Sequence, residues 1–85
     1  MVKPEVERKR IEKGLYRHFK GGLYEVLDTV IDSESLATMV LYRPVGSKSL
    51  WVRPYDMFVS LVERDGMLQK RFTFVQSQTE NGETS

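Results

Sequence analysis

The amino-acid sequence predicts an all-β fold, a small antiparallel SH3-like barrel of about five to six short strands. Its short apolar segments are rich in β-branched and aromatic residues, which favour strands. Turn residues separate these segments at intervals of about 8–12 positions. The 85 residues suffice for one small domain, and a sheet of this size exposes its edges unless it closes. An OB-like barrel is the second choice, because that fold usually needs a longer chain and a fuller helix.

The first part of the chain predicts a charged arm followed by a hairpin. Residues 1–13 predict a charged N-terminal arm or short helix, which Gly14 ends. Residues 15–19 alternate in character and predict the first strand. The Lys-Gly-Gly triplet at 20–22 predicts a turn, because glycine reaches positive φ without a Cβ clash. Residues 23–31 then predict a second strand.

Two prolines divide the middle of the chain. Residues 36–44 predict a central strand that ends at Pro44. Residues 50–53 predict a short strand that stops at Pro54, since proline cannot donate to a sheet ladder. Residues 54–57 predict a single helical turn with proline at its first position.

The last part of the chain predicts a hairpin and a polar tail. Residues 58–63 predict a strand, the Asp-Gly pair at 65–66 predicts a hairpin turn, and residues 67–75 predict the strand that closes the barrel. The barrel is therefore expected over residues 14–75. Residues 76–85 have no apolar side chain and predict a disordered tail.

Composition excludes several classes of site. The chain has no cysteine, which excludes disulfides, thiolate metal sites and a cysteine nucleophile. Its single histidine, His18, excludes a two-histidine metal site within one chain. The longest apolar run, residues 39–42, is far short of the about 20 residues that span a membrane. We therefore expect a soluble cytoplasmic protein with no membrane partner, no signal peptide and no cofactor.

Five sequence fragments stand in a fixed order within residues 14–72: GLYRHFKGGLYEVL, DSES, VLYRP, LWVRPYDMF and DGMLQKRF. Their order and spacing together resemble a small bacterial domain family of unknown function. The resemblance implies an SH3-like β-barrel, found alone or attached to other domains. It implies no activity, substrate or catalytic residue.

Trp51 and Arg53 are the first candidate binding residues. Along a strand, Leu50 and Val52 point to one side while Trp51 and Arg53 point to the other. If the apolar pair faces the core, Trp51 and Arg53 lie together on the outer face or the barrel rim. Alternatively, Trp51 is the largest member of the core and Arg53 lies over it.

Further aromatic and basic residues extend this candidate surface. Tyr16 and His18 oppose Leu15 and Phe19, and we expect the latter two to anchor in the barrel. Aromatic rings supply flat contact area at low entropy cost, and arginine supplies a planar fork for carboxylate or phosphate. The predicted binding residues are Tyr16, His18, Tyr42, Arg43, Trp51, Arg53 and Tyr55.

Two other kinds of site have weaker support. His18 could act as a general base with Asp28, Asp32 or Asp56 to orient it, but no spacing selects a catalytic triad. The same aspartates with Glu34 could bind a hard cation, but they lack the spacing of an EF-hand loop. Acidic residues in turns more often accept local backbone hydrogen bonds.

These observations predict a binding module that recognises a protein or peptide through its aromatic and arginine surface. Residues 1–20 carry seven Lys or Arg against three Glu, whereas residues 21–75 carry six basic and seven acidic side chains. The basic stripe typical of nucleic-acid domains is therefore missing, and a nucleic-acid-binding barrel is the alternative. A small hydrolase or nucleotide-binding protein that uses His18 ranks below it. Exposed strand edges leave a homo-oligomer open as well.

Overall fold

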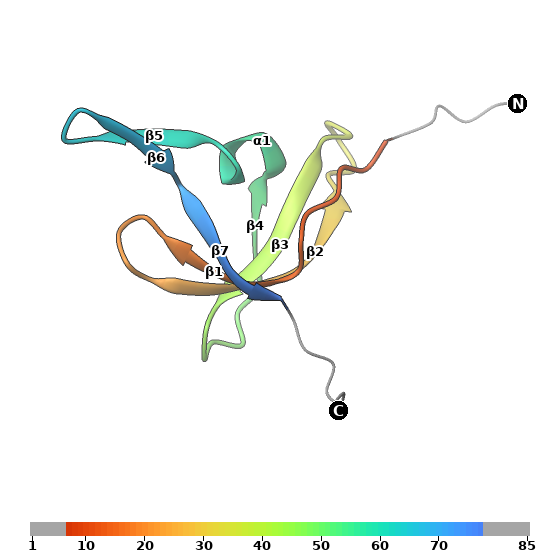
Figure 1. Ribbon diagram of the computed structural model, residues 1–85. Helices are drawn as coiled ribbons and strands as arrows, with labels where there is room; N and C mark the ends of the chain where they lie inside the picture. Colours follow the sequence, from red (N-terminus) through yellow and green to blue (C-terminus); the bar gives the residue numbers. More distant parts are fainter. Residues whose placement is uncertain (1–6, 78–85) are drawn as a thin grey trace, which may run out of the picture.

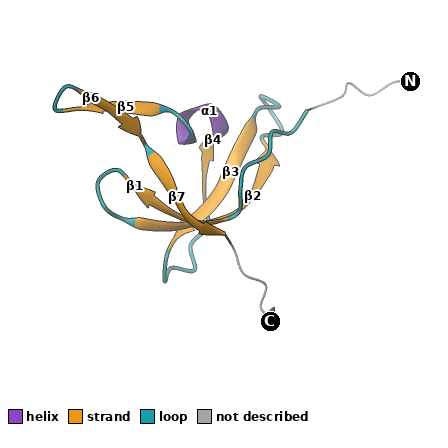
Figure 2. Cartoon of the chain, in the orientation of Figure 1, coloured by secondary structure: helices purple, strands orange, loops and turns teal. Residues whose placement is uncertain are grey.

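Residues 7–77, the part of the chain that the computed structural model describes, form an all-β fold with one short helix (Figure 1 and Figure 2). The all-β class predicted from the sequence is confirmed. No helix within this part of the chain is long and apolar enough to cross a membrane. The elements are β1 (Gly14–His18), β2 (Leu23–Ile31), β3 (Thr38–Pro44), β4 (Trp51–Pro54), α1 (Tyr55–Phe58), β5 (Leu61–Arg64), β6 (Met67–Lys70) and β7 (Phe72–Ser77).

Five strands form one open antiparallel sheet in the order β4-β3-β2-β1-β7. Strands β5 and β6 pair with each other as a separate hairpin, which extends away from the larger sheet in Figure 1. The prediction of a closed barrel is therefore wrong. The physical reason is that β5 and β6 satisfy each other's backbone groups and leave β4 and β7 as edge strands.

The core lies on one face of the five-stranded sheet, which we call the inner face. It is the face that carries the buried Val26 and Val40 side chains. Phe58 of α1 packs onto it, stacked on Phe72 at a centroid distance of 4.0 Å. The edge of its ring also meets Tyr42 at 5.3 Å. The one-turn helix therefore covers the sheet with a single large side chain.

A β-bulge in β2 changes which residues reach the inner face. The pairing with β3 shifts between Val26 and Asp28, so Leu27 is the extra residue. Beyond the bulge it is Thr29, opposite Val40, that is buried. Simple alternation would have placed the charged Asp28 on the buried face, and the bulge removes that conflict.

Several predicted boundaries needed correction. Phe58 belongs to α1 and not to a strand over residues 58–63, because its ring is drawn into the core; the strand begins at Leu61. The strand predicted over residues 67–75 is divided at Arg71, where the chain passes from one partner to another: the Arg71 N–H donates to Ser60 beside β5 at 3.0 Å, while its carbonyl accepts from Phe19 beside β1 at 2.9 Å. Strand β7 also reaches Ser77, beyond the predicted end of the barrel.

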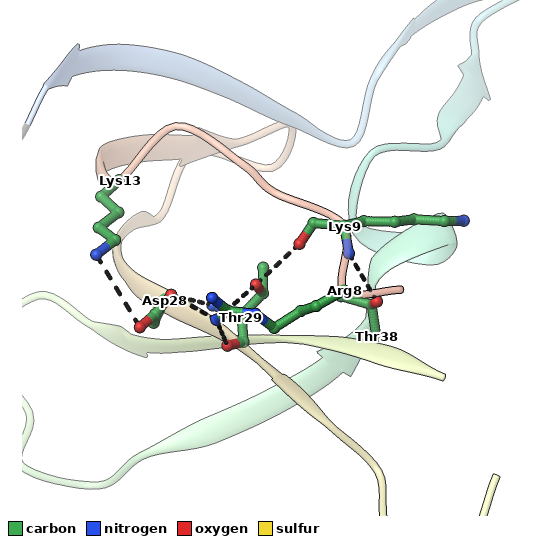
Figure 3. A network of polar contacts seen from close by, with 6 residues as sticks. All are labelled: Arg8, Lys9, Lys13, Asp28, Thr29 and Thr38. Atoms are coloured by element: carbon green, nitrogen blue, oxygen red, sulfur yellow. Dashed lines mark hydrogen bonds and ion pairs between the residues drawn. The ribbon is translucent and has the colours of Figure 1, made fainter. Parts of the chain in front are cut away.

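Residues 7–13, which we call the N-terminal segment, contain no helix and lie against β2 and β3 (Figure 3). The backbone N–H of Lys9 donates to Thr38 Oγ1 at 3.0 Å, and Thr29 Oγ1 donates to the carbonyl of Lys9 at 2.9 Å. Arg8 Nη1 donates to the carbonyl of Thr29 at 2.7 Å and pairs with Asp28 at 3.2 Å. The rest of the predicted arm and of the predicted tail lies outside the described residues.

Candidate binding surface

Trp51 lies on the inner face of β4, beside the core. The β3–β4 register pairs it with Tyr42, so strand alternation puts both side chains on the same face. The Trp51 ring centroid lies 5.9 Å from that of Tyr42 and 6.2 Å from that of Tyr24. Because β4 is an edge strand, 44% of Trp51 remains exposed. Two tyrosines thus contact an indole that solvent can still reach.

Of the two arrangements left open for residues 50–53, the one in which Leu50 and Val52 face the core does not occur. Leu50 is 58% exposed and Val52 is 52% exposed. The predicted alternation itself holds, but the register with β3 places Val52 opposite Leu41 on the outer face. Trp51 is therefore neither a fully buried core residue nor an outer-face residue. It is a half-exposed extension of the core.

Arg53 lies on the same face, two residues beyond Trp51. Its Nε donates to Tyr42 Oη at 3.2 Å, and its guanidinium carbon lies 5.7 Å from the centre of the Phe72 ring. Tyr42 is buried, so it supports the surface by holding Arg53 instead of contacting a partner itself. The two contacts orient a planar cation beside an exposed indole.

Tyr24 connects Trp51 with His18. The Tyr24 ring lies 6.1 Å from the His18 ring and 5.6 Å, edge to face, from Phe72. His18 in turn meets Phe72 at 4.8 Å. We call Trp51, Tyr24 and His18 the aromatic row. It crosses the inner face from the β4 edge to β1, with Phe72 packed against its middle and its far end.

Positive charge surrounds the His18 end of the aromatic row. Burial lowers the pKa of His18, and the charges of Arg53, Arg71 and Lys20 lower that pKa further. His18 Nδ1 also accepts a hydrogen bond from the backbone N–H of Lys20 at 3.1 Å. We call Lys20, Arg53 and Arg71 the cationic cluster.

Three other predicted binding residues lie elsewhere. Tyr16 is buried in the core, where its hydroxyl donates to the carbonyl of Glu12 at 2.6 Å, and burial raises its pKa to about 12. The prediction that Tyr16 faces away from the core is therefore wrong. Arg43 lies on the outer face and pairs with Glu25 at 3.0 Å. Tyr55 is half-buried beside Lys9, whose ammonium lies 5.2 Å from its ring.

The sequence prediction missed Tyr24, Phe72, Arg71 and Lys20. For Tyr24 a signal was present in the double glycine before it. A Cβ added at Gly22 would lie 3.2 Å from Tyr24 Cε1, which is tighter than ordinary van der Waals contact. Gly21 has a φ of +111° and needs glycine for the turn. Gly22 instead provides the space that the Tyr24 ring occupies.

The geometry gives no support to His18 as a catalytic base. Its ring packs between Phe19 and Phe72, and within residues 7–77 no carboxylate hydrogen-bonds to it. A catalytic histidine needs such a partner to orient it. The acidic candidates have local roles instead: Asp32 accepts the backbone N–H of Glu34 at 2.8 Å, and Asp56 pairs with Lys9 at 2.9 Å. The described residues contain no cluster of three potential metal ligands.

The lowered pKa of His18 predicts a pH effect on stability. The unfolded chain takes up this proton near the ordinary pKa of about 6.5, whereas the folded chain resists protonation until lower pH. The stabilising contribution is therefore present above about pH 6.5 and is lost as the pH falls below it. Because His18 is the only histidine, its ring-proton NMR signal can be titrated without ambiguity.

We expect an apparent His18 pKa below that of the urea-unfolded chain. We also expect the melting temperature of His18→Gln to fall less between pH 7.5 and pH 5 than that of the wild type. Equal pKa values in the folded and unfolded chains would contradict the assigned charge environment.

Comparisons with known proteins identify a family and a fold. A family model described as "Protein of unknown function (DUF1653)" matches residues 14–74. A crystal structure of a protein assigned to the same family, from Bordetella bronchiseptica, superposes with a TM-score of 0.71 at 24% sequence identity. The alignment covers 84% of this chain and 95% of that one. The comparison with curated proteins found no match.

Proposed function

Because the chain belongs to the DUF1653 family, whose function is unknown, we propose a function from the inner face alone: a module that binds a protein or peptide segment through Trp51, Tyr24, His18 and Arg53. The observation that carries the proposal is the half-exposed Trp51, contacted by two tyrosines beside the oriented Arg53. Tryptophan and arginine are the residues most enriched where interface energy concentrates.

The position of this surface also suits a peptide. Trp51 and Arg53 belong to β4, an edge strand of the sheet. An extended peptide can add to such an edge by backbone hydrogen bonds, and its alternate side chains then lie over the same face as Trp51. The rings that contact Trp51 are already in place, so little side-chain entropy is lost on binding.

We also propose that the open sheet is a variant of the SH3-like arrangement. A single helical turn stands before the last strands, as in SH3-like barrels, and the first and last strands pair with each other. The hairpin β5–β6 standing apart from the sheet is what leaves the arrangement open.

Peptide display can test the proposed surface. A random heptapeptide library would be selected on the immobilised chain, and the enriched peptides synthesised and titrated by Trp51 fluorescence, Trp51 being the only tryptophan. With labelled peptide as the reporter, Trp51→Ala is expected to weaken binding about 30-fold, the effect of a hot-spot residue.

Val52→Ala is the matched control, because Val52 is comparably exposed on the same strand but faces the other side. It should bind like the wild type. Thermal unfolding would establish that both variants fold. Undiminished binding by a folded Trp51→Ala, or equal losses in the two variants, would exclude the aromatic row as the contact surface.

A further inference from the structure

We propose that the cationic cluster makes this surface selective for a peptide that carries a carboxylate, placed so that the carboxylate meets Arg53, Arg71 and His18 while a neighbouring side chain packs on Trp51. The inference rests on the proposed peptide-binding function. It adds the chemistry of the partner, which the aromatic row alone does not specify.

The polar atoms at this end of the surface that have no partner among residues 7–77 are donors. Arg53 Nε donates to Tyr42 Oη, and Arg71 Nε donates to Ser60 Oγ at 3.1 Å. These bonds orient both guanidinium groups and leave their Nη atoms without an acceptor among residues 7–77. His18 Nδ1 accepts from the Lys20 backbone, so in the neutral ring the proton is on Nε2, which is then also a donor.

Three carboxylates of the described chain pair with other basic residues. Glu25 pairs with Arg43, and Asp56 pairs with Lys9. Asp28 pairs with Arg8 near the N-terminal segment. Within residues 7–77 no ion pair involves any member of the cationic cluster. The three charges that act on His18 therefore have no ion-pair partner of their own among residues 7–77.

Arg53 and His18 both lie close to the ring of Phe72. The Arg53 guanidinium carbon lies 5.7 Å from the centre of Phe72, and the His18 ring lies 4.8 Å from the same centre. Arg71 precedes Phe72, and its backbone carbonyl accepts from the N–H of Phe19, the residue after His18, at 2.9 Å. The Phe72 ring excludes water from one side of Arg53 and His18. An anion bound to these two residues would therefore experience a lower effective dielectric constant than on an open surface. Arginine forks match a carboxylate with two parallel hydrogen bonds.

A peptide carboxylate fits this arrangement better than a nucleic-acid strand. A strand needs basic residues along its whole path, and residues 21–75 carry more acidic than basic side chains. A single carboxylate needs only this one group of donors, whereas a polyanion would also meet the net negative charge of residues 21–75.

The experiment begins with the heptapeptides selected on the full chain at pH 7. We expect them to be enriched in Asp or Glu beside an aromatic or aliphatic residue. Exchange of the acidic residue for its amide is expected to weaken binding at least 10-fold. Each peptide is also compared with its C-terminal amide, which distinguishes a side-chain carboxylate from a terminal one.

Protein variants then locate the contact. Arg71→Gln is expected to weaken binding of the acidic peptide about 10-fold and to leave binding of its amide version nearly unchanged. The effects of the protein substitution and of the peptide substitution are then not additive. Lys20→Gln is a second variant, because no hydrogen bond or ion pair of the Lys20 side chain is found among residues 7–77; it is expected to fold and to weaken binding of the acidic peptide in the same direction. Arg17→Gln is the matched control, since Arg17 is exposed on the opposite face of β1 and the charge change is the same.

The outcomes separate the inference from the function on which it rests. Enrichment of neutral or basic peptides whose binding is lost in Trp51→Ala would overturn the carboxylate selectivity and leave peptide binding in place. An equal loss in Arg71→Gln and Arg17→Gln would show a general charge effect and would also overturn it. A twelve-nucleotide oligothymidine that binds in a Trp51-dependent manner, with no peptide enriched, would overturn both.

Discussion

Replacing Phe58 by alanine is expected to cost about 3–5 kcal/mol of folding free energy, the usual range for a buried phenylalanine. Phe58 is 1% exposed and stacks on Phe72, and its ring edges meet Tyr16 and Tyr42. A domain of this size has roughly 4–13 kcal/mol in total, at 0.05–0.15 kcal/mol per residue. The variant should therefore lose a large share of its stability and unfold at a clearly lower urea concentration than the wild type.

Urea denaturation followed by circular dichroism measures this effect. Met57→Ala is the matched control, because Met57 is the preceding residue of the same helical turn but is largely exposed. It should change the unfolding free energy by less than about 1 kcal/mol. Similar losses in the two variants would mean that α1 contributes through its backbone and not through the Phe58 ring.

Thr29→Val is expected to cost about 1–3 kcal/mol, because it leaves a polar group without its partner. Thr29 is 3% exposed, and its hydroxyl donates to the carbonyl of Lys9. Valine has nearly the same shape, so the change removes the hydrogen bond while leaving the packing of β2 in place. The N-terminal segment would lose one of its attachments to the sheet (Figure 3).

Amide hydrogen exchange can show where this loss acts. In Thr29→Val the Lys9 amide, which donates to Thr38 in the wild type, should exchange faster, while amides of β3 keep most of their protection. Thr73→Val is the control, because Thr73 is exposed on β7. A Lys9 amide that exchanges at the wild-type rate would show that the remaining contacts hold the segment without Thr29.

Most strands could be predicted from the sequence because their signals are local. Glycine and proline mark the ends of β1, β3 and β4, and each strand lies within a few residues of its predicted range. The errors arose where tertiary contacts decide. The core draws Phe58 into a helical turn, and a bulge shifts the alternation of β2 at Leu27. The extension of the helical turn to Phe58 has no local sequence signal, whereas Asp28 on an otherwise apolar side of residues 23–31 was a local sign of the bulge.

The candidate binding surface could also be predicted only in part, because tertiary contacts decide which of its residues meet. The sequence placed Trp51 and Arg53 on one side of a strand, and the structure agrees. Which side faces the core depends on the register with β3, which no property of residues 50–53 determines. His18 and Phe72 meet through the pairing of β1 with β7, two segments far apart in the chain. For that reason the sequence could not identify Phe72 and Arg71 as neighbours of His18.

The pairing of β1 with β7 also has a consequence for biosynthesis. Of the strands that the structure describes, β1 is made first and β7 last, yet they lie side by side in the sheet. At about 5–20 residues per second, translation leaves one edge of β1 unpaired for seconds. Contacts this distant along the chain also slow folding itself, typically to milliseconds or longer. During this interval the β1 edge is open to other nascent chains, so we expect misassembly during synthesis to begin there.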